Sequence, residues 1–299
     1  MRGFGLALAV GALAIGSAAW GESAEMRGKF PANVREANYL EAIVVDKIYG
    51  RDGGQAQTVI ENMVGIPSGR PDGALSGSVT TGVDVSRYEG KEDQCVEWKD
   101  GKKGGQCLRR ASVPVPCQRR VINLTISIRL TRIADNQPLW SDNKQLRDEV
   151  TWCLDRQPQR TTEEAISAMI KTLAEKIRYD VRPVYSTYKV RFREDRDGMP
   201  KDLGNEFKTI VKRSNKDVPG ACNDWTGFNA RLPNNASVLY NLGVCAEARG
   251  DYGKAEGFYG AAQNALGKKN DDMIESGNRI ARLRAMRAYD DEIARRRGR

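Results

Sequence analysis

The chain contains no histidine, and this absence excludes more chemistry than any other feature of its composition. Catalytic triads that need histidine cannot form, nor can histidine general bases or metal sites built on imidazole. The six cysteines include no Cys-x-x-Cys pair, the spacing typical of thiol redox catalysis and of zinc sites. Phosphate-binding, dinucleotide-binding and nucleophile-elbow motifs are also absent. We therefore expect a protein that is not an enzyme, with no catalytic residue, no cofactor and no metal.

The first twenty residues have the order of an export signal. Met1 and Arg2 form a short basic start, residues 4–15 are apolar, and small residues follow at 16–19. This pattern predicts a secretory signal peptide over residues 1–19, removed after Ala18 or Ala19. The alternative is a membrane anchor, but the apolar run is shorter than the roughly 20 residues that cross a bilayer. No cysteine stands near the cleavage site for lipid attachment. We expect a protein of an oxidising compartment, the bacterial periplasm.

The cysteines lie symmetrically about predicted turns. An exported chain with six cysteines can form three disulfide bonds, and the sequence alone allows fifteen pairings. Residues at equal distances from a hairpin turn face each other. The turns are centred on Gly101, on Asp135 and on Pro233-Asn234. The predicted bonds are Cys95–Cys107, Cys117–Cys153 and Cys222–Cys245.

The first half of the chain reads as strands with helices between them. Residues 122–131 alternate strictly between apolar and polar, which indicates a half-buried strand. After the turn at Asp135, residues 139–152 form its hairpin partner. Thr161 to Glu164 is a capping box that begins an amphipathic helix. The other predicted elements are strands at 39–49, 75–85 and 184–193, a helix at 55–64, and a projecting hairpin or loop at 89–116. We expect an α+β domain over residues 25–196, with a mixed, mainly antiparallel sheet.

The stretch from Val121 to Gln145, VINLTISIRLTRIADNQPLWSDNKQ, with the helix and strand after it, resembles α/β domains of the Gram-negative envelope. These are the curli-secretion lipoprotein domain, the amino-terminal domain of TolB and the lipoprotein activators of penicillin-binding proteins. The resemblance covers about residues 36–195 and implies a protein of the cell envelope.

The second half, residues 197–299, carries a spacing that resembles the tetratricopeptide repeat over about residues 200–290. Small and large residues recur at the spacings of this 34-residue unit, and shifts of 34 residues in both directions place further matches. Small residues are needed where the paired helices cross closely, and large ones fill the space between helices. The alternative is an ordinary helical hairpin. The matching residues are Leu239, Leu242, Gly243, Gly250, Tyr252, Ala255, Tyr259 and Ala262.

The repeat register implies a partner-binding face. Leading helices line the groove of such arrays, and Tyr240, Val244 and Glu247 share one helical face there. Tyrosine is well suited to a binding hot spot. The alternative is that Tyr240 packs against the closing helix near Met273 and Ile274.

The net charge of +9 is spread over several basic runs. The run with Lys189, Arg191 and Arg193 is a second candidate binding surface, while the alternative is a solvated strand face. Nucleic acid is not expected outside the cytoplasm, and anionic envelope polymers or acidic proteins fit better. We expect a protein-binding scaffold that acts in the assembly or tethering of an envelope structure. The alternatives are a peptidoglycan- or lipopolysaccharide-binding protein and a carboxylate-dependent glycan hydrolase.

Overall fold

The computed structural model describes residues 22–66, 69–101, 104–154 and 156–298, so the predicted export signal at 1–19 lies outside the described residues. The chain forms two compact units. Among the described residues, the sheet unit comprises 29–186 and 282–298, and the helical unit comprises 187–281 with 22–28. No described helix combines the length and the apolar character that a membrane span needs.

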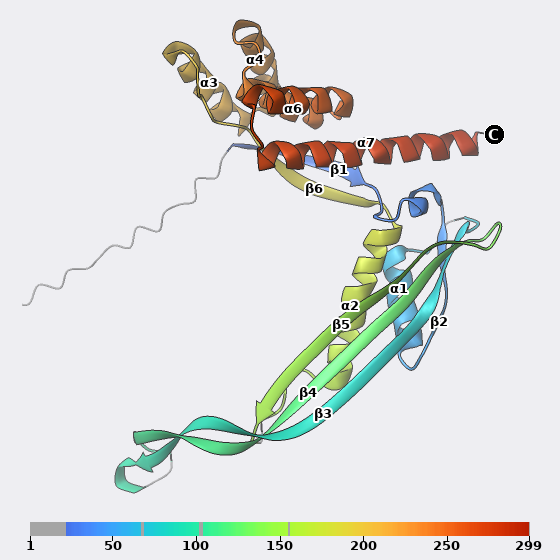
Figure 1. Ribbon diagram of the computed structural model, residues 1–299, viewed down its shortest axis with the longest axis vertical. Coiled ribbons are helices and arrows are strands. Elements are labelled where there is room, and N and C mark those ends of the chain that lie inside the picture. Colours follow the sequence, from blue (N-terminus) through green and yellow to red (C-terminus); the bar gives the residue numbers. More distant parts are fainter. Residues whose placement is uncertain (1–21, 67–68, 102–103, 155, 299) are drawn as a thin grey trace, which may run out of the picture. The chain divides into compact units, whose positions relative to one another are not determined.

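The sheet unit contains a four-stranded sheet with two helices on one face (Figure 1). The strand order is β2-β3-β4-β5, in which β2 and β3 are parallel while the β3–β4 and β4–β5 pairs are antiparallel. The short helix η1 (Glu36–Tyr39) precedes the sheet. The other elements are β2 (Ile43–Tyr49), α1 (Gly53–Val64), β3 (Gly73–Trp98), β4 (Cys107–Arg132), β5 (Gln137–Cys153) and α2 (Thr162–Val181).

The core of this unit follows from the alternation in β4. Leu124, Ile126 and Leu130 are fully buried against α1 and α2, because successive side chains of a strand point to opposite faces. Helix α2 begins at the capping box predicted from the sequence: the Thr161 side chain accepts from the Glu164 backbone N–H, and the Glu164 carboxylate accepts from Thr161 N–H. Lys144 occupies a core-facing position of β5, where Asp180 pairs with its ammonium at 2.6 Å.

The hairpin of β3 and β4 extends well past the end of β5 (Figure 1). We call its outer part, residues 84–98 and 107–117, the ribbon. The last β4–β5 register pair is Cys117 with Cys153, so the ribbon has only two strands. The Cys117–Cys153 bond holds its base and the Cys95–Cys107 bond lies near its tip. An isolated two-stranded hairpin is marginal in water, so these bonds replace a missing hydrophobic layer.

The helical unit consists of short paired helices and most of a two-stranded sheet, β1 (Ser23–Phe30) with β6 (Val184–Arg191). Helices α3 and α4, α4 and α5, and α5 and α6 are neighbours in space. The helix α7 contributes residues to both units. The helices are α3 (Lys201–Ser214), α4 (Val218–Arg231), α5 (Ala236–Ala248), α6 (Tyr252–Leu266) and α7 (Asp271–Arg297).

Helices α5 and α6 cross closely at Gly243. A Cβ atom added there would stand 2.6 Å from the Tyr259 ring, closer than any real side chain allows. The disulfide Cys222–Cys245 joins α4 to α5, with Cα atoms 5.5 Å apart. The small residue and the third disulfide bond therefore stand where the sequence predicted them.

The α+β fold class and all three disulfide pairings are confirmed. Three details of the predicted sheet are wrong. The strand β1 was not predicted, because two of its three inward residues, Ala24 and Gly28 beside Met26, are small and give a weak hydrophobic alternation. The strand expected at 184–193 pairs with β1 and lies outside the four-stranded sheet. The strand expected from residue 39 begins at Ile43, since Glu36–Tyr39 forms a 3-10 turn. The domain boundary at residues 196 and 197 stays a prediction.

Candidate functional site

The predicted groove residues of α5 lie inside the helical unit. Tyr240 is 4% exposed, Val244 is 0% exposed and Glu247 is 3% exposed. The prediction of an accessible groove face at these residues is therefore wrong. The alternative stated for Tyr240 holds, because its hydroxyl lies 3.2 Å from the hydroxyl of Ser276 on the closing helix. The face was misassigned because nearly the whole of α5 is buried, so the helix has no solvent-exposed side to offer.

Glu247 is the centre of a buried polar cluster. Arg279 donates from Nε to one carboxylate oxygen at 2.7 Å and from a terminal nitrogen to the other at 2.9 Å. The Tyr259 hydroxyl donates to the same carboxylate at 2.6 Å. The Arg279 guanidinium also lies 5.4 Å from the centre of the Tyr188 ring. A bidentate pair with further donors is the arrangement that a buried carboxylate requires.

The pKa values of Tyr188, Tyr259 and Arg279 are all shifted by burial and by the neighbouring Glu247. Burial raises the pKa of Tyr259, and the negative charge of Glu247 raises it further. Burial and Glu247 act in the same way on the pKa of Tyr188. For Arg279, burial by itself lowers the pKa, but the bond to Glu247 outweighs it and the pKa is raised. The cluster therefore pairs the buried carboxylate of Glu247 with the guanidinium of Arg279, beside tyrosines whose pKa values are raised.

The basic strand segment divides into exposed and engaged residues. Lys189 and Arg191 are exposed on β6, and Arg27 is exposed on the adjoining strand β1. Arg193 differs, because its guanidinium pairs with Asp195 at 3.1 Å. The buried amide of Asn241 accepts from the backbone N–H of Arg193 and donates to its carbonyl, at 2.7 and 3.1 Å. Two of the three predicted basic residues thus lie on the exposed surface, and Arg193 mainly anchors the segment to α5.

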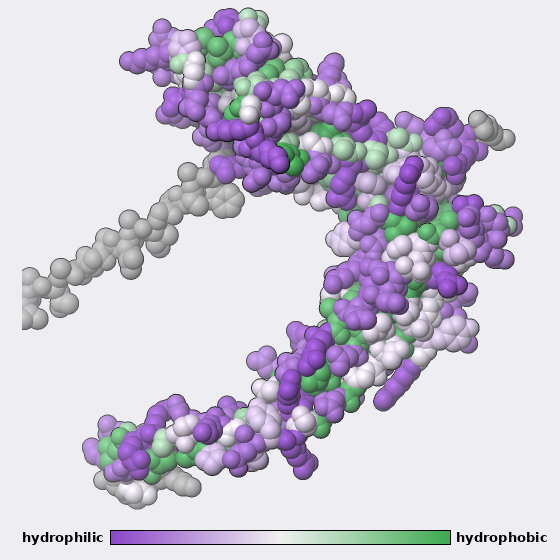
Figure 2. All heavy atoms as spheres, in the orientation of Figure 1, coloured by the Kyte–Doolittle hydropathy of each residue, from purple (hydrophilic) through white to green (hydrophobic). Residues whose placement is uncertain are grey.

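The ribbon is a further candidate surface, and it belongs to the sheet unit. Val85 is 54% exposed, Tyr88 44%, Val96 40% and Leu108 58%. Figure 2 shows green apolar spheres among purple charged ones at the end of the ribbon. These exposed apolar side chains on a projecting element make the ribbon a candidate contact surface for another protein. The sequence analysis predicted the projection but assigned it no binding role.

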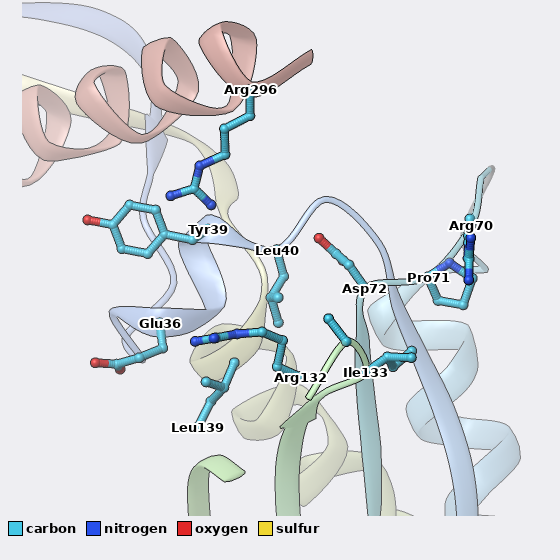
Figure 3. A pocket seen from close by; sticks show the side chains of 11 residues that line it. Glu36, Tyr39, Leu40, Arg70, Pro71, Asp72, Arg132, Ile133, Leu139 and Arg296 are labelled. Carbon is cyan, nitrogen blue, oxygen red and sulfur yellow. The ribbon is translucent and has the colours of Figure 1, made fainter. Parts of the chain in front are cut away.

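A cavity of about 710 Å³ opens where η1, the β4–β5 turn and the end of α7 come together within the sheet unit (Figure 3). Asp72 does not act as a free carboxylate there, because both of its oxygens accept backbone N–H groups, from Glu41 and Ala42. Arg132 pairs with Asp135 at 3.1 Å, and Arg296 lies 5.4 Å from the centre of the Tyr39 ring. Asp72, Arg132 and Arg296 are thus each engaged by a neighbouring group.

The sequence analysis did not recognise two features of the structure, which are the Glu247–Arg279 ion pair and the alternating charges along β3. The Glu247–Arg279 pair joins residues of two different helices, and no local pattern indicates it. The second feature could have been found from the sequence, because every second residue of a strand lies on the same face. The alternating charges are those of Arg87, Glu89, Lys91 and Asp93.

No family model and no curated protein matches this chain. One similar solved structure is a candidate lipoprotein from Caulobacter crescentus CB15, with 13% identity, 50% of this chain and 92% of that chain covered, and a TM-score of 0.27. Another is a PelC dodecamer from Paraburkholderia phytofirmans, with 15% identity, 52% and 97% coverage, and a TM-score of 0.23.

Proposed function

We propose that this protein is a non-enzymatic scaffold that binds another protein during the assembly or tethering of a cell-envelope structure. The observation that carries the proposal is the ribbon. It projects beyond the helix-covered sheet, is held by two disulfide bonds and exposes Val96 and Leu108 near its tip. A rigid projection of this kind costs little ordering entropy when it binds, because the disulfides have already restricted it.

The compartment in this proposal is the periplasm. Three disulfide bonds are typical of chains that fold in an oxidising space outside the cytoplasm. The predicted signal peptide over residues 1–19 is consistent with export by cleavage after Ala18 or Ala19.

The helical unit belongs to the proposal as a tetratricopeptide-like module. The close crossing at Gly243, with Tyr259 against it, supports this assignment. Because α5 is buried, the accessible surface of such a module lies on its other helices.

The proposal is tested with the full-length oxidised protein as bait in an envelope extract, followed by mass spectrometry. We expect the double variant Val96→Ser, Leu108→Ser to lose the partners that the native protein captures. The matched control is Ile66→Ser, which removes an apolar side chain that is 88% exposed on the loop after α1. Equal capture by the native protein and the double variant would show that the tip is not the binding surface.

A second candidate function is binding of an anionic envelope polymer by the exposed cations Arg27, Lys189 and Arg191. Binding of this kind depends on charge and weakens with salt. Sedimentation of the protein with purified sacculi at low and high salt measures it. Binding that is lost after Lys189→Ala with Arg191→Ala would support this candidate, and salt-independent sedimentation would contradict it.

A further inference from the structure

The two outer edges of the ribbon are not equivalent. Strand β3 pairs with β2 only as far as Ser78, and the sheet order places no other described strand on that edge. The β4 edge beyond β5 contains Pro114 and Pro116, whereas β3 contains no proline from Gly73 to Trp98. Proline has no N–H group, so it blocks an edge against another strand.

The hydrogen-bonding directions support this difference. The carbonyl of Pro116 accepts from Leu154 N–H at 2.9 Å, so Pro116 directs its backbone groups away from β3. Cys117 and Cys153 are a close cross-strand pair with Cα atoms 3.9 Å apart, which places the backbone groups of Cys117 toward β3. Its partner Tyr88 therefore directs its backbone groups toward β4. The residues on either side of Tyr88, at odd positions, direct theirs to the free edge.

The side chains at these odd positions alternate in charge. Arg87, Glu89, Lys91 and Asp93 stand on one face of β3, and all four are exposed. The pattern of signs is plus, minus, plus, minus, which is antisymmetric about Gly90. A second β3 strand that runs antiparallel, with a two-fold axis at Gly90, would place Arg87 opposite Asp93 and Glu89 opposite Lys91. Every charge on this face then meets its opposite, and each of the two ion pairs occurs twice.

Neighbouring registers lack this property. A shift of the axis to Glu89 places that residue opposite its own copy and sets Arg87 opposite Lys91. A shift to Lys91 places two lysines together and sets Glu89 opposite Asp93. An axis at Tyr88 sets Asp84 opposite Glu92, and an axis at Glu92 brings two copies of that carboxylate together, in both cases on the other face. Like charges directly opposite each other destabilise a strand pair, so the pattern selects one register.

We infer that the free edge of β3 over residues 86–94 pairs antiparallel with the same edge of a second copy of this chain, about a two-fold axis at Gly90. The edge has unpaired backbone groups, no proline and a self-complementary charge pattern. A two-fold contact uses the same patch on both copies, as this pattern requires. The inference goes beyond the proposed function, because the tip residues Val96 and Leu108 serve other partners and are tested in a different experiment.

The test is the self-association of the purified, oxidised full-length protein, measured by sedimentation velocity over a range of concentrations. We expect a monomer–dimer equilibrium that weakens at high salt. Glu89→Lys alone and Lys91→Glu alone each create like-charge pairs, and we expect each to weaken dimerisation roughly tenfold or more. The two variants mixed together restore both pairs. In the mixed dimer, the lysine introduced by the first substitution faces the glutamate introduced by the second.

Recovery in the mixture would support the inference and would show that both variants are folded. The matched control is Lys171→Glu on the exposed face of α2, which makes the same charge change away from the edge and should leave the dimer intact. The inference is overturned if the native protein stays monomeric, or if both single variants dimerise as the native protein does. Since no other protein is present, failure here leaves the proposed capture of a partner untouched.

Discussion

The sheet unit and the helical unit differ in what lies at their centres. The sheet unit buries an apolar layer, in which β4 contributes Leu124, Ile126 and Leu130 against two helices. The helical unit buries a charged centre, in which Glu247 is paired with Arg279 and bonded to Tyr259. An apolar core tolerates the loss of one side chain in proportion to the cavity formed, whereas a buried ion pair fails when either partner is removed. The two units should therefore respond differently to equally small changes.

The largest effect is expected at the charged centre. Glu247→Ala removes the partner of a buried Arg279, whose side chain is 13% exposed, and should destabilise the helical unit by about 4 kcal/mol. Hydrogen exchange measured segment by segment will separate this unit from the rest of the chain. The matched control is Glu206→Ala, which breaks an exposed pair with Arg231 and should cost much less, because solvent screens exposed ion pairs. Similar losses in the two variants would contradict the central role of Glu247.

The second-largest loss of stability is expected at the base of the ribbon, where a disulfide bond takes the place of a hydrophobic core. Removal of the Cys117–Cys153 bond, by Cys117→Ser with Cys153→Ser, opens a loop with a sequence separation of 36 residues. The chain-entropy account gives a loss of roughly 3–4 kcal/mol. Denaturant unfolding measures the loss, and mass mapping of the non-reduced protein first checks the pairing. Unchanged stability would mean that the ribbon base is held by side-chain contacts instead.

A somewhat smaller effect is expected in the apolar layer. Leu124→Ala leaves a cavity beneath α1 and α2 and should destabilise the sheet unit by about 3 kcal/mol. Leu108→Ala is the matched control on the ribbon, where the same side chain is 58% exposed and its loss should cost less than about 0.5 kcal/mol. If the two leucines behaved alike in urea unfolding, the layered description of this sheet would be wrong.

The smallest effect is expected at the start of α2. Thr161→Ala removes the side chain that accepts from Glu164 N–H at 3.2 Å, and the loss should be about 1 kcal/mol. Thr161→Ser retains the acceptor and serves as the control. Thermal unfolding measured by circular dichroism should rank the native protein and the serine variant together, above the alanine variant. A serine variant as unstable as the alanine variant would mean that the methyl group matters and the cap does not.

Much of the fold could be read from local patterns. The alternation in residues 122–131 and the capping box at Thr161 specify their elements through contacts between near neighbours. The disulfide pairs followed from symmetry about Gly101, Asp135 and Asn234, because a hairpin turn determines which residues meet. The strand β1 escaped this approach, since small inward residues such as Ala24 carry a weak hydrophobic signal.

The candidate site was less accessible to sequence reasoning. Tyr240 and Glu247 share a face, as their spacing indicates, but spacing does not say whether that face meets solvent or another helix. Their burial depends on α6 and α7, which contribute Tyr259 and Arg279 from 12 and 32 residues further along the chain. A helix covered on all sides looks locally like one that presents a groove, because each contains apolar and polar residues at helical spacing.

By itself the sequence determined the absence of histidine chemistry, the three disulfide bonds, the α+β class and the projecting hairpin. These depend on composition and on pairings across single turns. Only the tertiary structure decided which faces are covered. In the folded chain, Glu247 lies buried beside Arg279. The edge of β3 beyond β2 pairs with no described strand, whereas the edge of β4 beyond β5 contains Pro114 and Pro116. The physical reason is that burial and edge exposure are set by elements distant in sequence, whereas periodicity reports only the arrangement within one element.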